Sequence, residues 1–158
     1  MHTNLDLSDT FGVNTCLADA IGVKNLVRAD VGECLFVGEL YREVNIADFA
    51  LDVKSALGCD GLRYTDVKQS VKKVGVASGS GGSNIFDAVN ANIDVLLTGE
   101  IKHHEINFAN EAQINIIDVG HFKSEDVVIL PLINRLSKEF SDIIFTKSTT
   151  YSDKIKFA

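Results

Sequence analysis

Apolar and polar positions along the chain follow two periods, and each period predicts one kind of element. Short apolar runs bounded by turn residues are typical of buried strands. Apolar positions three and four apart are typical of helices that bury one face. The sequence therefore predicts strands at 24–27, 33–40, 62–64, 71–77, 94–97, 114–117 and 143–145, with one more near 155–157, and helices at 14–21, 46–57, 84–90, 101–112 and from 127 onward.

Residues that favour helix ends support two of these helices. Asn45 stands directly before the apolar positions of the 46–57 helix, and Gly58 follows its last apolar residue. Asparagine is a preferred N-cap, and glycine adopts the left-handed conformation that ends many helices. Asn14 and Gly22 are expected to play the same two roles for the helix at 14–21.

The helix after residue 127 contains Pro131, the only proline of the chain. Proline is tolerated in the first turn of a helix but not in its middle. We therefore expect the regular helix to start near Leu130 and to turn its apolar face toward the core. That face consists of Leu132, Ile133, Leu136 and Phe140.

The predicted strands and helices alternate, which is the signature of an α/β protein. The fold class we expect is α/β, with mixed, largely parallel sheet layers covered by helices, in a single region of 158 residues. In open α/β sheets, sites form beyond the carboxyl ends of the strands. Three loops that follow predicted strands carry polar chemistry, at 78–83, 98–104 and 118–125, and we expect them to converge on one cleft.

The loop at 118–125 contains the most informative pair of residues. His121 and Glu125 are four apart, so on a helical turn both side chains point the same way. An imidazole and a carboxylate at that spacing can hold a divalent metal ion. The alternative is a polar loop in which Ser124 caps the next helix. A second pair with the same spacing, His2 and Asp6, favours the metal site.

The segment Ser78-Gly79-Ser80-Gly81-Gly82-Ser83 follows a predicted strand and precedes a predicted helix. This layout presents backbone N–H groups to an anion, so Gly79, Ser80, Gly81 and Gly82 are candidate ligand-binding residues. The segment has neither a Walker motif nor a GxGxxG motif. A tight turn that needs small residues for close packing explains it equally well.

The composition narrows the class of protein. The net charge of −7 and the scattered lysines and arginines argue against a nucleic-acid partner. No apolar run is long enough to cross a bilayer, and the acidic residues Asp6 and Asp9 do not fit a secretory signal. Cys16, Cys34 and Cys59 have no CxxC spacing, which is typical of reduced thiols and predicts a cytoplasmic protein.

Several motifs in this order resemble the NIF-three-like family (NGG-one interacting factor three-like, also labelled GTP cyclohydrolase I type 2-like). They are His-Thr-Asn-Leu-Asp at 2–6, Gly-Val-Asn at 12–14, the glycine-rich segment at 75–83, Thr-Gly-Glu at 98–100 and Gly-His-Phe-Lys-Ser-Glu at 120–125. The resemblance covers nearly the whole chain. It implies a dinuclear metal centre between two α/β halves and a ring-shaped homohexamer.

The resemblance also assigns roles to individual residues. His2, Asp6, His121 and Glu125 match metal ligands, and the ligand types suit zinc, iron or manganese. Glu100, His103 and His104 match the polar wall beside the metals, where we expect Glu100 and His104 to relay protons in catalysis.

One departure from the family pattern is expected to matter. Family members carry a region ahead of the His-Thr-Asn-Leu-Asp motif, with two adjacent histidines that complete the metal sites, and this chain shows no counterpart. We therefore expect the C-terminal portion of the family fold, holding at most one metal ion tightly. The expected function is metal-dependent hydrolysis of a nucleotide or related phosphorylated compound. The alternatives are a non-enzymatic metal-binding or protein-interaction module and an inactive truncated family member.

Overall fold

The computed structural model describes residues 4–30 and 34–158. In this part of the chain six strands form one mixed sheet with the order β1-β2-β4-β5-β6-β3. The elements are the 3₁₀ helices η1 (Leu5–Leu7) and η2 (Gly81–Asn84), the strands β1 (Lys24–Arg28), β2 (Phe36–Asn45), β3 (Arg63–Tyr64), β4 (Ser70–Ala77), β5 (Val95–Thr98) and β6 (Asn115–Asp118), and the helices α1 (Val13–Ala20), α2 (Ile46–Leu57), α3 (Ile85–Ala91), α4 (His103–Glu111), α5 (His121–Asp126) and α6 (Ile129–Glu139).

The sheet is parallel in its middle and antiparallel on its flanks. β4, β5 and β6 run parallel, whereas β2 on β4, β1 on β2 and β3 on β6 are antiparallel. The expected α/β class with a mixed sheet is thus confirmed, but the sheet is not largely parallel, because three of its five strand pairings are antiparallel. Each parallel step is made through a helix, α3 between β4 and β5 and α4 between β5 and β6. Such crossovers are the usual route between parallel neighbours.

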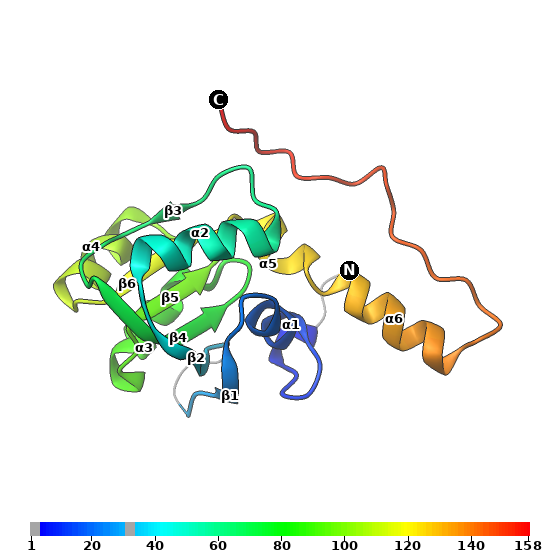
Figure 1. Ribbon diagram of the computed structural model, residues 1–158, viewed down its shortest axis with the longest axis horizontal. Coiled ribbons are helices and arrows are strands. Elements are labelled where there is room, and N and C mark those ends of the chain that lie inside the picture. Colours follow the sequence, from blue (N-terminus) through cyan, green and yellow to red (C-terminus); the bar gives the residue numbers. More distant parts are fainter. Residues whose placement is uncertain (1–3, 31–33) are drawn as a thin grey trace.

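Helices cover both faces of the sheet, as Figure 1 shows. α1 and α2 pack with Val95, Leu97 and Ile117 in one apolar cluster, and α3 and α4 pack with Leu96 and Ile116 in the other. Successive strand residues point to opposite faces, so a central strand between two layers of helices must be apolar throughout. This explains the continuous apolar runs of β5 and β6.

The two predicted helix caps have different outcomes. Asn45 is the N-cap of α2, where its Oδ1 accepts a hydrogen bond from the Ala47 N–H at 2.9 Å. Asn14 does not cap α1, so that prediction is wrong. The N-cap is Gly12, and Asn14 lies inside the helix, fully buried. Its side chain is taken up by contacts with other loops, described below.

The C-terminal predictions fail in a consistent way. α6 begins at Ile129 with Pro131 in its first turn, as expected, but none of its residues is buried. Phe140 remains 45% exposed, so the apolar face of α6 does not reach the core. No strand forms at 143–145 or 155–157. In Figure 1, α6 and the chain after it lie outside the layered body. Within the described residues no helix has the length and apolarity needed to cross a membrane.

Candidate metal and catalytic site

The three polar loops emerge from the same edge of the sheet. In the parallel register Ala77 pairs with Thr98, and Thr98 pairs with Asp118, so β4, β5 and β6 end side by side. The loops that start at residues 78, 99 and 119 therefore begin as neighbours. The expected convergence of these loops is confirmed by the contacts between them.

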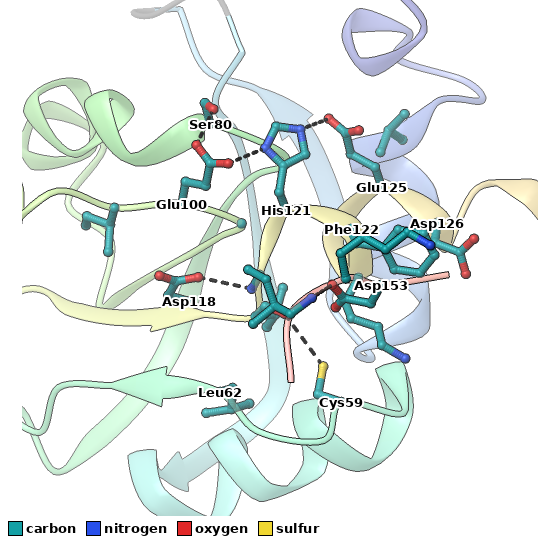
Figure 2. Close-up of a pocket in the computed structure, with 18 of the residues that line it drawn as sticks. Cys59, Leu62, Ser80, Glu100, Asp118, His121, Phe122, Glu125, Asp126 and Asp153 are labelled. Atoms are coloured by element: carbon teal, nitrogen blue, oxygen red, sulfur yellow. Dashed lines mark hydrogen bonds and ion pairs between the residues drawn. The ribbon is translucent and has the colours of Figure 1, made fainter. Parts of the chain in front are cut away.

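Two hydrogen bonds link three side chains from these loops, and a fourth side chain, that of Glu125, contacts the end of this series (Figure 2). Ser80 Oγ donates to Glu100 Oε2 at 2.6 Å, and Glu100 Oε1 lies 2.7 Å from His121 Nδ1. On the other side of the ring, His121 Nε2 lies 3.1 Å from Glu125 Oε1. The predicted pairing of His121 with Glu125 on one helical turn is thus present, on α5.

The charge state of Glu100 fixes the donor in this chain. The hydrogen bond from Ser80, followed by that from His121, holds the pKa of Glu100 below its usual range. Glu100 is therefore ionised at neutral pH and can only accept hydrogen bonds. His121 Nδ1 must then carry a hydrogen, and Nε2 is the ring atom that faces Glu125. A carboxylate on the outer nitrogen is the arrangement that orients histidines which bind metal through the other nitrogen.

Ser124 is a buried junction that sequence reasoning did not place in the site. Its Oγ accepts from the Gly79 N–H at 2.9 Å and donates to the His121 carbonyl at 2.8 Å. A Cβ on Gly99 would lie 2.5 Å from the same oxygen. One hydroxyl thus joins the glycine-rich loop to the 118–125 loop and packs against Gly99 of the third loop. From the sequence, Ser124 is only an alternative candidate for a helix cap. A cap makes local hydrogen bonds, so that interpretation does not predict the contacts of Ser124 with Gly79 and Gly99.

The glycine-rich segment packs closely against the same side chains. A Cβ on Gly79 would lie 2.5 Å from Glu125 Oε1, and Gly79 has a positive φ of 60°. A Cβ on Gly81 would meet Ala77, and one on Gly82 would meet the Glu100 carbonyl. These contacts support the close-packing explanation of the glycines. Anion binding by Gly79, Ser80, Gly81 and Gly82 stays a prediction.

The N-terminal motif is attached to the site through Asn14. Asn14 Nδ2 donates to the Asp6 carbonyl at 3.0 Å, and Asn14 Oδ1 accepts from the Ser78 N–H at 2.8 Å. Asp6, in η1, lines the same two cavities as His121 and Glu125. Three of the four predicted ligands thus border one space. His2, the fourth, lies outside the described residues.

Two cavities meet at this cluster, one of about 1210 Å³ and one of about 530 Å³. The smaller lies on the side of the glycine-rich segment. The larger extends past α5 toward Arg63, which pairs with the buried carboxylate of Asp118. Both carry mixed polar and apolar walls, as small-molecule sites usually do.

His103 and His104 lie apart from this cluster. Both are exposed in the first turn of α4, and neither is among the described residues that line the two cavities. His103 contacts Asn107 instead, at 3.4 Å. Of the two residues predicted to relay protons, the structure brings Glu100 to His121 but not His104. Lys102, the N-cap of α4, and the buried Glu105 of this helix do line the larger cavity.

The described side chains provide part of a binding site for a divalent ion. His121 Nε2 and Glu125 lie together, and Glu100 orients the ring as the outer partner of a metal-binding histidine does. A Cβ at Gly79 would lie 2.5 Å from Glu125 Oε1, so the absence of a side chain there lets the Glu125 carboxylate take its place beside His121. Within residues 4–30 and 34–158, however, no three His, Cys, Asp or Glu side chains meet in one metal-binding group. The pair therefore needs further ligands, and Asp6 lines the same two cavities.

The fold and the site together define an α/β protein with a carboxylate–imidazole cluster beyond the carboxyl ends of parallel strands. Residues 1–154 match the family described as Duf34/NIF3 (NGG1p interacting factor 3). The chain belongs to this family, and the resemblance drawn from its motifs is confirmed.

Two curated relatives carry the name GTP cyclohydrolase 1 type 2 homolog. The one from Clostridium perfringens is 31% identical over 99% of this chain and 62% of its own length. The one from Deinococcus radiodurans is 32% identical over 88% of this chain and 54% of its own. The crystal structure of the hypothetical protein SA1388 from Staphylococcus aureus superimposes with a TM-score of 0.89, at 26% identity, over 100% of this chain and 67% of that one. The chain thus spans less than two thirds of the length of these two curated relatives.

Proposed function

We propose that this protein binds a divalent metal ion at His121 and Glu125, with Asp6 and His2 as further ligands. The observation that carries the proposal is the contact of 3.1 Å between His121 Nε2 and Glu125 Oε1. Because Glu100 holds the hydrogen on Nδ1, a neutral ring turns a lone pair toward the Glu125 carboxylate. Two acceptors at this distance repel each other unless a positive charge lies between them.

A proton on Nε2 and a metal ion are the two charges that satisfy this geometry. The histidine and carboxylate ligands suit zinc, iron or manganese, and no feature of the pair selects one of them. The metal explains more of the surroundings, because Asp6 borders the same two cavities as the pair. We expect at most one tightly bound ion per chain.

As an enzyme, the protein would be a metal-dependent hydrolase acting on a nucleotide or a related phosphorylated compound. A bound divalent ion supplies an activated water at neutral pH. In this chain Glu100 orients the His121 ring by accepting a hydrogen bond from its Nδ1–H, and the hydrogen bond from Ser80 helps to keep Glu100 ionised. The relatives from Clostridium perfringens and Deinococcus radiodurans support a nucleotide substrate through their names, GTP cyclohydrolase 1 type 2 homolog. These names describe each relative as a homolog of the enzyme.

A non-enzymatic metal-binding or protein-interaction module is the second candidate. The position of His104 favours it, because one of the two predicted proton-relay groups does not line either cavity of the described structure. A cytoplasmic location and assembly into a homohexamer stay predictions of the sequence. Light scattering on the purified protein checks the assembly.

Elemental analysis of purified chains, loaded in turn with Zn²⁺, Fe²⁺ and Mn²⁺, tests the proposal. We expect one bound ion per chain in the wild type and loss of binding in His121→Ala. Glu100→Gln, which weakens the partner of the ring, should lower metal affinity by roughly 10- to 100-fold. His104→Ala is the matched histidine variant, and its metal content should equal that of the wild type.

The same samples separate the two candidate functions. Turnover of GTP that requires the metal and disappears in His121→Ala supports the hydrolase. Metal uptake without turnover of nucleotides or phosphodiesters supports the binding module. Wild-type metal content in His121→Ala would overturn the metal site itself, and two ions per chain would overturn the expected stoichiometry.

A further inference from the structure

The larger cavity has a wall that the candidate metal cluster does not provide. Residues 147–157, which we call the C-terminal strap, run past the cavity and line it with Tyr151, Asp153, Ile155 and Phe157, among others. The strap forms neither helix nor strand. It follows α6 after a turn and returns toward the body of the molecule, as Figure 1 shows.

Two contacts attach the strap to α5. The Lys147 ammonium forms an ion pair with the Asp126 carboxylate. The Tyr151 ring packs on the Phe122 ring with centroids 5.5 Å apart. Phe122 and Asp126 are four residues apart, so they form a row along one side of this short helix.

A third contact lies across the cavity, at the loop before β3. The Phe157 ring covers Gly61 so closely that a Cβ on Gly61 would lie 2.6 Å from the ring. The strap is therefore held at both ends, on α5 and on the Gly61 loop, and it passes over the space between them. Cys59 lines the same cavity at the edge of the body's apolar cluster, with its thiol hydrogen-bonded to the Val119 carbonyl and only 7% of the residue exposed.

α5 connects the strap to the candidate site. His121 and Glu125 point toward Glu100 and the glycine-rich segment, while Phe122 and Asp126, the next residue in each case, hold the strap. Successive helical residues are about 100° apart, so the two rows lie on adjoining sides of one helix. An occupant of the larger cavity would therefore have both His121 and the strap in its walls.

The strap is held more weakly than the body it covers. Tyr151 is 69% exposed, Ile155 is 63% exposed and Phe157 is 54% exposed, although each touches the cavity. Segments with few buried contacts and no hydrogen-bonded ladder open at a small fraction of the free energy of global unfolding. The strap has the properties of a movable cover, whereas β5 and β6 behind the site do not.

We propose that the C-terminal strap is a lid on the larger cavity, which closes beside His121 and lifts to admit or release a substrate too large to pass beneath it. The proposal deepens the proposed function, because it concerns access to the same site. The lid itself is defined by the contacts with α5 and Gly61, so it can be tested without metal or substrate.

The thiol of Cys59 provides the test. In a chain with Cys16→Ser and Cys34→Ser, Cys59 is the only cysteine, and its rate of reaction with a disulfide reagent such as DTNB reports opening of the cover. Tyr151→Ala removes one aromatic contact of the strap. We expect it to speed the reaction about three- to tenfold, the factor that corresponds to losing one aromatic pair. A chain ending at Thr146 should react faster still.

Tyr41→Ala is the matched control. Tyr41 is a tyrosine on β2 that is 97% exposed and lines neither cavity. Its reaction rate should equal that of the parent chain. Urea unfolding of each variant shows whether a faster reaction reflects local opening, in which case the free energy of global unfolding stays unchanged. Equal rates in Tyr151→Ala and the parent, or an increase explained by global destabilisation, would overturn the lid.

Metal content measured on the same variants keeps the two proposals apart. If the thiol reacts faster in Tyr151→Ala while the wild type binds no metal, the lid holds and the metal site fails. If His121→Ala loses its metal while Tyr151→Ala leaves the thiol rate unchanged, the metal site holds and the lid fails.

Discussion

The sheet-centred body and the C-terminal region differ sharply in how they treat their apolar side chains. Within the described residues, every buried apolar residue lies at or before Val128. Residues 129–158 contain seven of the thirteen large apolar side chains that are exposed in the described part of the chain. They are Leu130, Phe140, Ile143, Ile144, Tyr151, Ile155 and Phe157. Both regions carry apolar patterns, but only the body buries them within this chain.

This difference teaches what an apolar pattern means. The spacing of apolar residues in α6 shows that burial of one helix face is favourable, but it does not show which surface covers that face. In the body the covering surface is the sheet, a few residues away along the chain. The described part of the structure covers α6 only in part, for example where the Arg135 guanidinium lies 5.0 Å from the centre of the Phe11 ring.

The largest expected effect is on core packing, and a pair of identical substitutions measures it. Leu97 is fully buried in β5, whereas Leu130 in α6 is 58% exposed. Leu97→Ala should lower the free energy of unfolding by about 2–5 kcal/mol, through lost burial and a residual cavity. Leu130→Ala should change it by no more than about 0.5 kcal/mol. Urea unfolding followed by circular dichroism gives both values.

A comparable loss in the two variants would break the comparison. It would mean that the apolar face of α6 is covered in solution as fully as the core is. Light scattering on the Leu130→Ala sample then shows whether self-association provides that cover.

Local sequence patterns predicted the helices and strands of the body well, because residues close in sequence determine where these elements begin and end. Asn45, Gly58 and the apolar spacing between them gave α2 its bounds as observed. The strand-to-loop positions of Ser80, Glu100 and His121 were enough to predict that they meet. Their order in the chain places them after successive strands, and parallel strands end at one edge.

The remaining features depend on contacts that no local pattern reveals. Asn14 resembles an N-cap by residue type, but its amide is used to join η1 to the loop after β4. Ser124 resembles a cap as well, and instead joins Gly79 to His121. In both cases a buried polar side chain needs partners, and one partner of each, Ser78 for Asn14 and Gly79 for Ser124, lies 45 residues or more away along the chain.

The body also sets the geometry of the site. Substituting each of two glycines distinguishes an effect on this geometry from an effect of backbone strain. Gly79 and Gly22 both have positive φ, of 60° and 80°. An added Cβ on Gly79 would press on Glu125, whereas nothing lies within 4 Å of one on Gly22. Both alanine variants should lose roughly 1–2 kcal/mol of stability from the left-handed backbone. Only Gly79→Ala should also reduce metal uptake.

Elemental analysis of the two glycine variants checks this expectation at matched stability. Equal metal content in Gly79→Ala and Gly22→Ala would show that the site tolerates displacement of Glu125. The close packing of the glycine-rich segment would then serve folding alone.

The smallest expected effects come from the loss of single charges. In the body, the charge we consider is that of the Asp94 carboxylate. Burial alone would raise the pKa of Asp94, but hydrogen bonds from the Lys68 side chain and from the Lys73 and Lys72 N–H groups outweigh it, so the pKa lies below its usual range. A carboxyl group whose pKa falls on folding stabilises the protein above its unfolded pKa. That stabilisation is lost as the pH falls through the lower, folded value.

Asp94→Asn and Lys147→Met compare this charge with the single ion pair that Lys147 of the strap makes with Asp126. At pH 7 Asp94→Asn should be less stable than the wild type, and the gap should narrow as the pH falls below about 4, the ordinary pKa of aspartate. Lys147→Met should stay within about 1 kcal/mol of the wild type at pH 7, because partly exposed pairs contribute little. Urea midpoints at pH 7, 5, 4 and 3 measure both. If the gap for Asp94→Asn were constant across this range, the carboxylate charge would not be what stabilises the start of β5, and the body would differ from the strap in packing alone.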